Sequence, residues 1–161
     1  MRIKSTLLLI LLATFTFGCK QKGNNNPKTT VSEAKKKLEV INRVLVDKDK
    51  EDIEAYISRH RLDGMEENKS GLFYLVWGEA TGPKVKTGDV VFLDFKVTLL
   101  DGTECYSSEK SRPMEFLVGH GGVESGLEMA VLLMFEGQSG KFILPPHLGH
   151  GLLGDMDMIP P

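Results

Sequence analysis

The sequence predicts an α+β domain in which a twisted antiparallel sheet wraps around one short helix, preceded by an N-terminal helical segment. Three observations support this prediction. Residues 119–138 form an apolar stretch with helical spacing, residues 90–99 alternate with one apolar face, and Asp101-Gly102 follows them as a hairpin turn. Hairpins on either side of a single helix indicate an antiparallel sheet that covers it.

The helix expected within residues 119–138 is central to this fold. Its apolar residues recur at helical spacing and share one face, namely Val123, Leu127, Ala130, Val131 and Met134. Leu132 and Leu133 lie on other faces, so we expect the helix to be covered on more than one side. Glu136-Gly137 is expected to end it.

Length and composition limit the possibilities. The chain has 161 residues, of which 41% are hydrophobic and 26% charged, which fits one modest domain with appendages. The net charge is −2, and loss of Arg2 and Lys4 with a leader would make it −4. A nucleic-acid-binding function is disfavoured because such proteins present a basic face.

Residues 1–18 are predicted to be a lipoprotein signal peptide. Arg2 and Lys4 form a positive start, residues 6–17 are an apolar run too short for a comfortable membrane span, and Gly18-Cys19 follows. This end resembles the bacterial lipobox, which implies that Cys19 is lipidated and that the protein is anchored in the bacterial cell envelope. An uncleaved anchor, or a plain signal peptide with an unrelated cysteine, remains an alternative.

Two further segments precede the domain. Residues 19–31 are polar and asparagine-rich and are interpreted as a flexible tether. Residues 32–64 are expected to form a helical spacer, with one helix capped by Ser32 and a second starting at Asp49. An apolar stripe in the first helix indicates either a helical hairpin docked on the domain or an arm for dimerisation or client binding, and both interpretations stay open.

The domain itself is expected over residues 70–161. Its strands are predicted from runs of β-branched and aromatic residues and from alternation, at residues 72–77, 90–99, 104–107, 113–118 and 141–144.

This part of the chain resembles the FKBP-type peptidyl-prolyl isomerases, and the matching motifs run in register from Ser70 to the last residue. They include Ser70-Gly71-Leu72-Phe73-Tyr74, Gly88-Asp89, Asp101-Gly102, Ser107-Ser108, Pro113, Phe116, Gly126-Leu127-Glu128, Glu136-Gly137-Gln138, Pro145 and Ile159-Pro160-Pro161. With the lipobox and helical spacer, the chain is also similar to exported bacterial FKBP lipoproteins, including those associated with gliding motility. The resemblance implies the same fold, a sheet wrapped around one helix.

The resemblance also implies a catalytic set of three residues. Phe95 stands where the family has a tyrosine, and His150 stands where a loop tyrosine donates its hydroxyl. Cys105-Tyr106 replaces a Phe-Asp pair, so the family's buried carboxylate is absent from that position. Phe95, Tyr106 and His150 are therefore the expected catalytic residues, with a ring nitrogen of His150 as the donor.

The residues expected to contact substrate are carried over in the same way. Glu124 is expected to act through its backbone N–H, and Leu127 replaces the tryptophan that forms the pocket floor. The full set is Cys105, Met114, Phe116, Val123, Glu124, Leu127 and Ile159. Leu127 and Phe95 also fit an ordinary core, and Cys105 fits a small buried hydrophobe.

Beyond Pro161 the family continues into a final strand, so we expect residues 70–161 to lack that strand and to leave neighbouring strand edges unpaired. No cofactor is expected, because amide rotation needs none. No metal site is expected either, because His120, His147 and His150 are scattered through loops without a ligand motif.

Two functions from different classes follow from the resemblance. The first is prolyl isomerisation that assists the folding of exported, proline-containing polypeptides, by an enzyme held to the membrane through its lipid anchor. The second is a non-catalytic chaperone or assembly module that holds client segments in the same apolar groove. Neither requires nucleic acid, and the sequence does not set the oligomeric state.

The lipid-anchor hypothesis predicts the effect of replacing Cys19. Cys19→Ala or Cys19→Ser should leave an unprocessed or soluble product, whereas the wild type should sediment with membranes because several acyl chains hold a protein firmly. Labelling with a radioactive fatty acid measures this directly. An unlabelled and freely soluble wild-type protein would contradict the hypothesis.

Overall fold

The computed structural model describes residues 30–160 of the chain. The predicted signal peptide, Cys19, nearly all of the tether and Pro161 lie outside the described residues. Within 30–160, no helix combines the length and the apolar character needed to cross a membrane.

The N-terminal segment is one continuous helix, α1 (Val31–His60), of 30 residues. It begins with a capping box, in which the Glu33 N–H donates to Thr30 Oγ1 at 3.3 Å and the Thr30 N–H donates to Glu33 Oε2 at 3.0 Å. The predicted cap at Ser32 and the predicted second start at Asp49 are therefore wrong. No glycine or proline interrupts residues 31–60, so the helix passes through Asp49 and ends at Arg61, whose φ is 51°.

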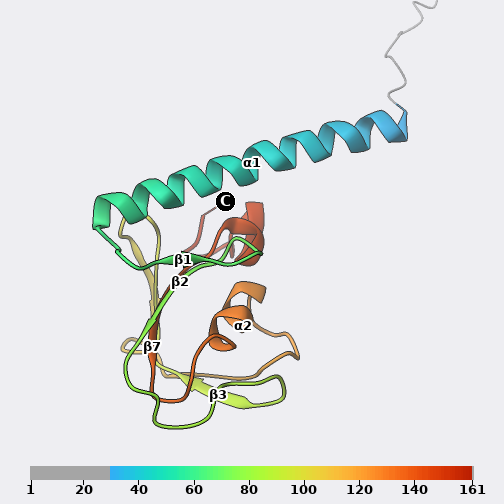
Figure 1. Ribbon diagram of the computed structural model, residues 1–161. Helices are drawn as coiled ribbons and strands as arrows, with labels where there is room; N and C mark the ends of the chain where they lie inside the picture. The colour runs from blue at the N-terminus through green and yellow to red at the C-terminus, as the bar shows by residue number, and fades with distance from the viewer. Residues whose placement is uncertain (1–29, 161) are drawn as a thin grey trace, which may run out of the picture.

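Only the C-terminal part of α1 docks on the domain. Ile53 and Tyr56 are buried and pack with Phe73 and Ile143 on one face of the sheet. Lys141 adds a cation–π contact, with its Nζ 5.6 Å from the centre of the Tyr56 ring. The N-terminal part of the helix extends past the domain (Figure 1). The predicted helical hairpin is therefore wrong, because the segment is a single helix that docks by one end only.

All strand pairs in the described residues are antiparallel. One sheet has the order β1 (Glu66–Glu67), β2 (Phe73–Trp77), β7 (Ser139–Ile143). Two further pairs join β3 (Val90–Leu93) to β6 (Met114–Leu117) and β4 (Lys96–Thr98) to β5 (Glu104–Ser107). The hairpin between β4 and β5 turns at the predicted Asp101-Gly102, where Gly102 has a φ of 93°.

The long strand expected over residues 90–99 is divided at Asp94 and Phe95. The Phe95 N–H donates to Ser108 Oγ at 3.0 Å, and the Ser108 N–H donates to the Phe95 carbonyl at 2.9 Å. These bonds hold the backbone of Phe95 outside the regular ladder, so β3 and β4 are separate strands.

The central helix α2 (Ser125–Val131) has 7 residues and is shorter than the sequence suggests. Residues 119–124 form a glycine-rich loop before it. Two core clusters flank the helix. Ala130 packs with Leu72 and Leu148 in one, and Val131 packs with Phe116 and Val118 in the other. Two short 3-10 helices, η1 (Pro146–Leu148) and η2 (Gly151–Leu153), follow β7. The α+β prediction, one short helix covered on two sides by antiparallel strands, is confirmed.

Truncating the buried side chain of α1 tests its docking. Ile53 is 3% exposed, and Ile53→Ala should lower the free energy of unfolding by about 2–5 kcal/mol, through lost burial and the cavity left behind. Val40→Ala is the matched control on the same helix, because Val40 is 60% exposed. Denaturant unfolding measures both, and an unchanged midpoint for Ile53→Ala would show that α1 does not belong to the core.

Candidate functional site

An apolar cluster between α2 and the β3–β6 pair gathers four of the residues expected to contact substrate. Phe116 is buried on β6, and Met114, Val123 and Leu127 pack around it and are partly buried. The alternation of β6 turns Met114 and Phe116 to the same side, and α2 supplies Leu127. The cluster offers an apolar surface of the kind that a proline ring fits.

The loop before α2 is fixed by Glu128, for which the sequence predicted no role beyond its place in the Gly126-Leu127-Glu128 motif. Glu128 Oε1 accepts hydrogen bonds from the N–H groups of Gly119 at 3.1 Å and Gly121 at 3.0 Å. These bonds tie the start of the loop to the helix that ends it, which sets the position of Val123 and Glu124. A carboxylate in the first turn of a helix after a glycine-rich loop is the signal that could have indicated this role.

Glu124 is the N-cap residue of α2 and presents two polar groups. Its backbone N–H donates to no other residue of the described range. Its side chain meets His150, with 3.1 Å between Glu124 Oε1 and His150 Nε2. One ring nitrogen of His150, the residue expected to donate from such a nitrogen, is therefore engaged by a carboxylate.

A second polar contact joins β5 to the C-terminal loop. The Tyr106 hydroxyl donates to Asp155 Oδ2, and Asp155 Oδ1 accepts the N–H groups of Asp157 at 2.9 Å and Ile159 at 2.8 Å. The Tyr106 hydrogen bond is the main reason why the pKa of Asp155 falls to about 2. The same bond, together with burial, raises the pKa of Tyr106 to about 12.

The position of Tyr106 lacks the family's carboxylate, as expected, but the site does not lack one. Asp155 brings a carboxylate to Tyr106 from 49 residues further along the chain. No local pattern indicates a contact over that separation. The Ile159 N–H is held by Asp155, and Cys105 contacts the same loop, with Sγ 3.6 Å from the Met158 carbonyl.

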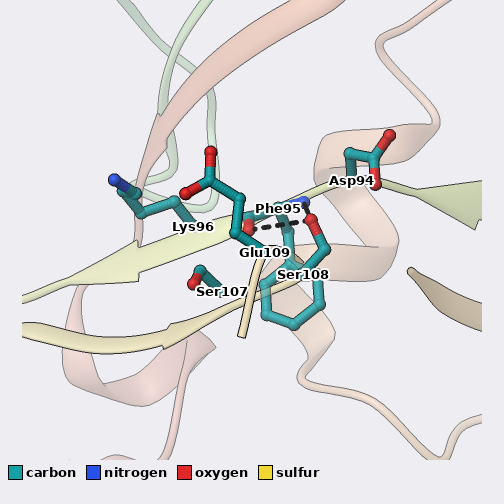
Figure 2. Close-up of a pocket in the computed structure, with 6 residues that line it drawn as sticks. All are labelled: Asp94, Phe95, Lys96, Ser107, Ser108 and Glu109. Carbon is teal, nitrogen blue, oxygen red and sulfur yellow. Dashed lines mark hydrogen bonds between the residues drawn. The ribbon is translucent and has the colours of Figure 1, made fainter. Parts of the chain in front are cut away.

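Phe95 is not among the residues that pack in the Phe116 cluster. It lines a hollow of about 520 Å³ at the corner between β3 and β4 together with Asp94, Lys96, Ser107, Ser108 and Glu109. Figure 2 shows the Phe95 ring next to Ser108, with dashed lines for the two hydrogen bonds of Ser108 Oγ, which accepts from the Phe95 N–H and donates to the Phe95 carbonyl. Most residues around this hollow are polar, so it suits a proline ring less well than the cluster beside α2. We place the candidate site at the cluster and at its polar rim, which consists of Glu124, His150, Tyr106 and Asp155.

The described residues 30–160 contain no group of three His, Cys, Asp or Glu side chains arranged to hold a metal ion. His147 is instead tied to the backbone, with Nε2 3.1 Å from the Ser70 carbonyl.

An antiparallel sheet folded over one short helix, with an apolar cluster beside that helix, defines the FKBP-like class of α+β domain. Residues 82–161 match the family model described as FKBP-type peptidyl-prolyl cis-trans isomerase. The FKBP-type peptidyl-prolyl cis-trans isomerase domain is therefore the part of the chain that this model matches, residues 82–161.

Curated relatives are similar over about half of this chain. FK506-binding protein 2 of Dictyostelium discoideum is 41% identical over 78 residues, covering 48% of this chain and 59% of the relative. The peptidyl-prolyl cis-trans isomerase FKBP2 of Mus musculus is 37% identical over 78 residues, covering 48% of this chain and 56% of the relative. The chain thus spans less than two thirds of the length of these relatives.

Solved structures share the fold. The crystal structure of FkpA from Escherichia coli has a TM-score of 0.58 and 27% sequence identity, and the match covers 83% of this chain and 68% of that chain. A peptidyl-prolyl cis-trans isomerase from Pseudomonas syringae has a TM-score of 0.60 at 22% identity over 74% of this chain and 84% of that chain, and this likeness concerns the fold alone.

The Tyr106–Asp155 contact predicts a pH dependence of stability. Because folding lowers the pKa of Asp155 from 3.8 to about 2, the contact stabilises the fold above about pH 4, and this stabilisation is lost as the pH falls toward 2. Tyr106→Phe removes the main cause. The variant should melt at a lower temperature than the wild type at pH 7. This difference in melting temperature should become smaller between pH 4 and pH 2.

Thermal unfolding across this pH range measures the effect. Tyr74→Phe is the matched control, because the Tyr74 hydroxyl bonds Glu66 at 2.5 Å, away from the C-terminal loop. A difference in melting temperature between wild type and Tyr106→Phe that stays constant from pH 7 to pH 2 would contradict the conclusion that the Tyr106 hydrogen bond lowers the pKa of Asp155.

Proposed function

We propose that this chain is a peptidyl-prolyl cis-trans isomerase that assists the folding of exported proteins from a membrane-anchored position. One observation carries the isomerase part. Phe116, Val123 and Leu127 form an apolar surface beside α2, within the residues that match the FKBP-type family. The proposal also draws on relatives that are named peptidyl-prolyl cis-trans isomerase.

Prolyl isomerisation requires few chemical groups from the protein. Rotation about an X-Pro amide has a barrier of about 18–20 kcal/mol, because amide resonance opposes it, and uncatalysed exchange takes roughly tens to hundreds of seconds. No proton is transferred and no nucleophile is needed. A surface that holds the proline ring and excludes water from the amide favours the twisted state, in which resonance is lost.

The residues of the site fit these tasks. The Phe116 ring and the Leu127 side chain hold the proline ring, and Val123 closes the surface at the loop. The Glu124 N–H, which is free of other partners in the described range, donates to the carbonyl of the substrate. Glu128 keeps this N–H in place by fixing the loop from Gly119 to Gly121.

The membrane-anchored part of the proposal is supported by the sequence alone. Residues 1–18 have the features of a lipoprotein signal peptide, Cys19 is the lipidation site, and a polar tether follows. This arrangement holds the domain near a membrane of the bacterial cell envelope, where unfolded exported chains are its clients.

A second candidate function is supported by the polar rim. The Tyr106 hydroxyl and His150 Nε2 both contact carboxylates, Asp155 and Glu124 respectively, so neither is free to assist rotation in this conformation. A site with an intact apolar surface and occupied donors fits a non-catalytic chaperone or assembly module that holds client segments.

Two substitutions separate these functions. Leu127→Ala should lower catalysis of a Leu-Pro or Phe-Pro peptide by removing part of the apolar surface, and it should cost about 2 kcal/mol of stability as a partial core truncation. Leu153→Ala, at a side chain that is 78% exposed, is the matched control. His150→Phe keeps bulk but removes the ring nitrogens, so the isomerase proposal expects turnover to fall, and both proposals expect client binding to stay nearly unchanged.

A protease-coupled isomerisation assay, run beside a client-aggregation assay on variants shown to be folded, measures both activities. Acceleration above the spontaneous rate supports the enzyme. No acceleration, together with normal suppression of aggregation, would overturn the isomerase proposal in favour of the chaperone.

A further inference from the structure

The N-terminal part of α1, residues 31–46, is an apolar arm with nothing packed on it among the described residues. Leu38 is 59% exposed and Ile41 is 53% exposed, although both are large aliphatic residues. The apolar positions follow one another at intervals of three and four and share one face of the helix, namely Val31, Ala34, Leu38, Ile41 and Leu45. Such a face is typical of a helix that packs against another surface.

A second unpartnered apolar surface lies on the outside of the β3–β6 pair. Val90 is 53%, Phe92 69% and Leu117 38% exposed, and the register places Val90 opposite Leu117. The alternate residues Val91 and Leu93 face inward and pack with Phe116. The domain itself therefore packs only against the inner face of this pair. We call the opposite face, with Val90, Phe92 and Leu117, the outer β3–β6 face.

The two surfaces carry opposite charge. The arm has four Lys and Arg residues against two Glu, whereas residues 47–161 have 11 Lys and Arg against 20 Asp and Glu. Exposed carboxylates border the outer β3–β6 face at Asp89, Asp94 and Glu115, and Glu115 is paired directly with Phe92. A basic apolar helix thus complements an acidic apolar sheet face.

The arm does not reach the outer β3–β6 face of its own chain. Ile53 and Tyr56 fix the C-terminal part of α1 on the sheet that contains β2 and β7. Figure 1 shows α1 along one side of the domain and β3 near the opposite side, with the blue end of the helix pointing away from the domain. The partner for the arm must be another molecule.

We propose that the arm of one copy of this chain docks on the outer β3–β6 face of a second copy, and that the reciprocal contact forms a two-fold dimer. Both halves of the contact are present on every copy, which is what a self-complementary interface requires. Direct pairing of two arms is disfavoured, because both are basic and the apolar repeat ends where Lys48 and Asp52 occupy its next two positions. An anionic membrane surface is disfavoured because it repels the acidic remainder of the chain.

Sedimentation of the full chain in a density-matched mild detergent tests the proposal. The wild type should be a dimer, and Ile41→Glu and Phe92→Glu should each weaken dimerisation at least about tenfold, because each places a carboxylate in the contact. Val46→Glu is the matched control. Val46 is 45% exposed and lies five residues from Ile41, on another side of the helix, so this variant should stay dimeric. Circular dichroism checks that each variant is folded.

Mixing the two disruptive variants gives a sharper result. A reciprocal dimer has two arm-to-face contacts, so Ile41→Glu mixed with Phe92→Glu leaves one intact contact and should form mixed dimers, although each variant alone is monomeric. Loss of dimers in Ile41→Glu but not in Phe92→Glu would overturn the proposal in favour of paired arms. A monomeric wild type that binds anionic vesicles more tightly than neutral ones, with Ile41→Glu losing this preference, would overturn it in favour of a membrane surface, because the acyl anchor on Cys19 is the same in both proteins. None of these readouts depends on isomerase activity.

Discussion

The burial of α2 on two sides is the constraint on which the rest of this domain depends. A helix of 7 residues is far too short to be stable by itself, since isolated helices shorter than about 12–15 residues are marginal in water. Its stability comes from packing, with Ala130 against Leu72 and Leu148, and Val131 against Phe116 and Val118. The strands around α2 therefore stabilise the helix, and the helix in turn gives them a common core.

The candidate site follows from the same packing. Two of the partly buried residues of the Phe116 cluster, Val123 and Leu127, lie at the start of α2. Around them, polar contacts fix the chain from three directions. Glu128 holds the loop before the helix, His150 meets Glu124, and Asp155 bonds Tyr106. The apolar surface and its rim thus depend on segments that are distant in sequence.

The sequence predicts well those features that depend on neighbouring residues. The turn at Asp101-Gly102 and the following strand from Glu104 to Ser107 appear where local propensity places them. It predicts poorly what distant residues decide. The break at Phe95 depends on Ser108, 13 residues away, and the carboxylate at Tyr106 comes from Asp155, 49 residues away. Asp49 resembles a helix start but lies within α1, because nothing nearby ends the helix that precedes it.

The central claim is that the cluster beside α2, and not the polar hollow beside Phe95, receives proline. Titration of the full chain with a Leu-Pro peptide, followed by nuclear magnetic resonance, tests this claim most directly. We predict saturable shifts at the methyl groups of Met114, Val123 and Leu127 and at the backbone amide of Glu124. Shifts confined to Phe95, Ser107 and Ser108 would contradict it.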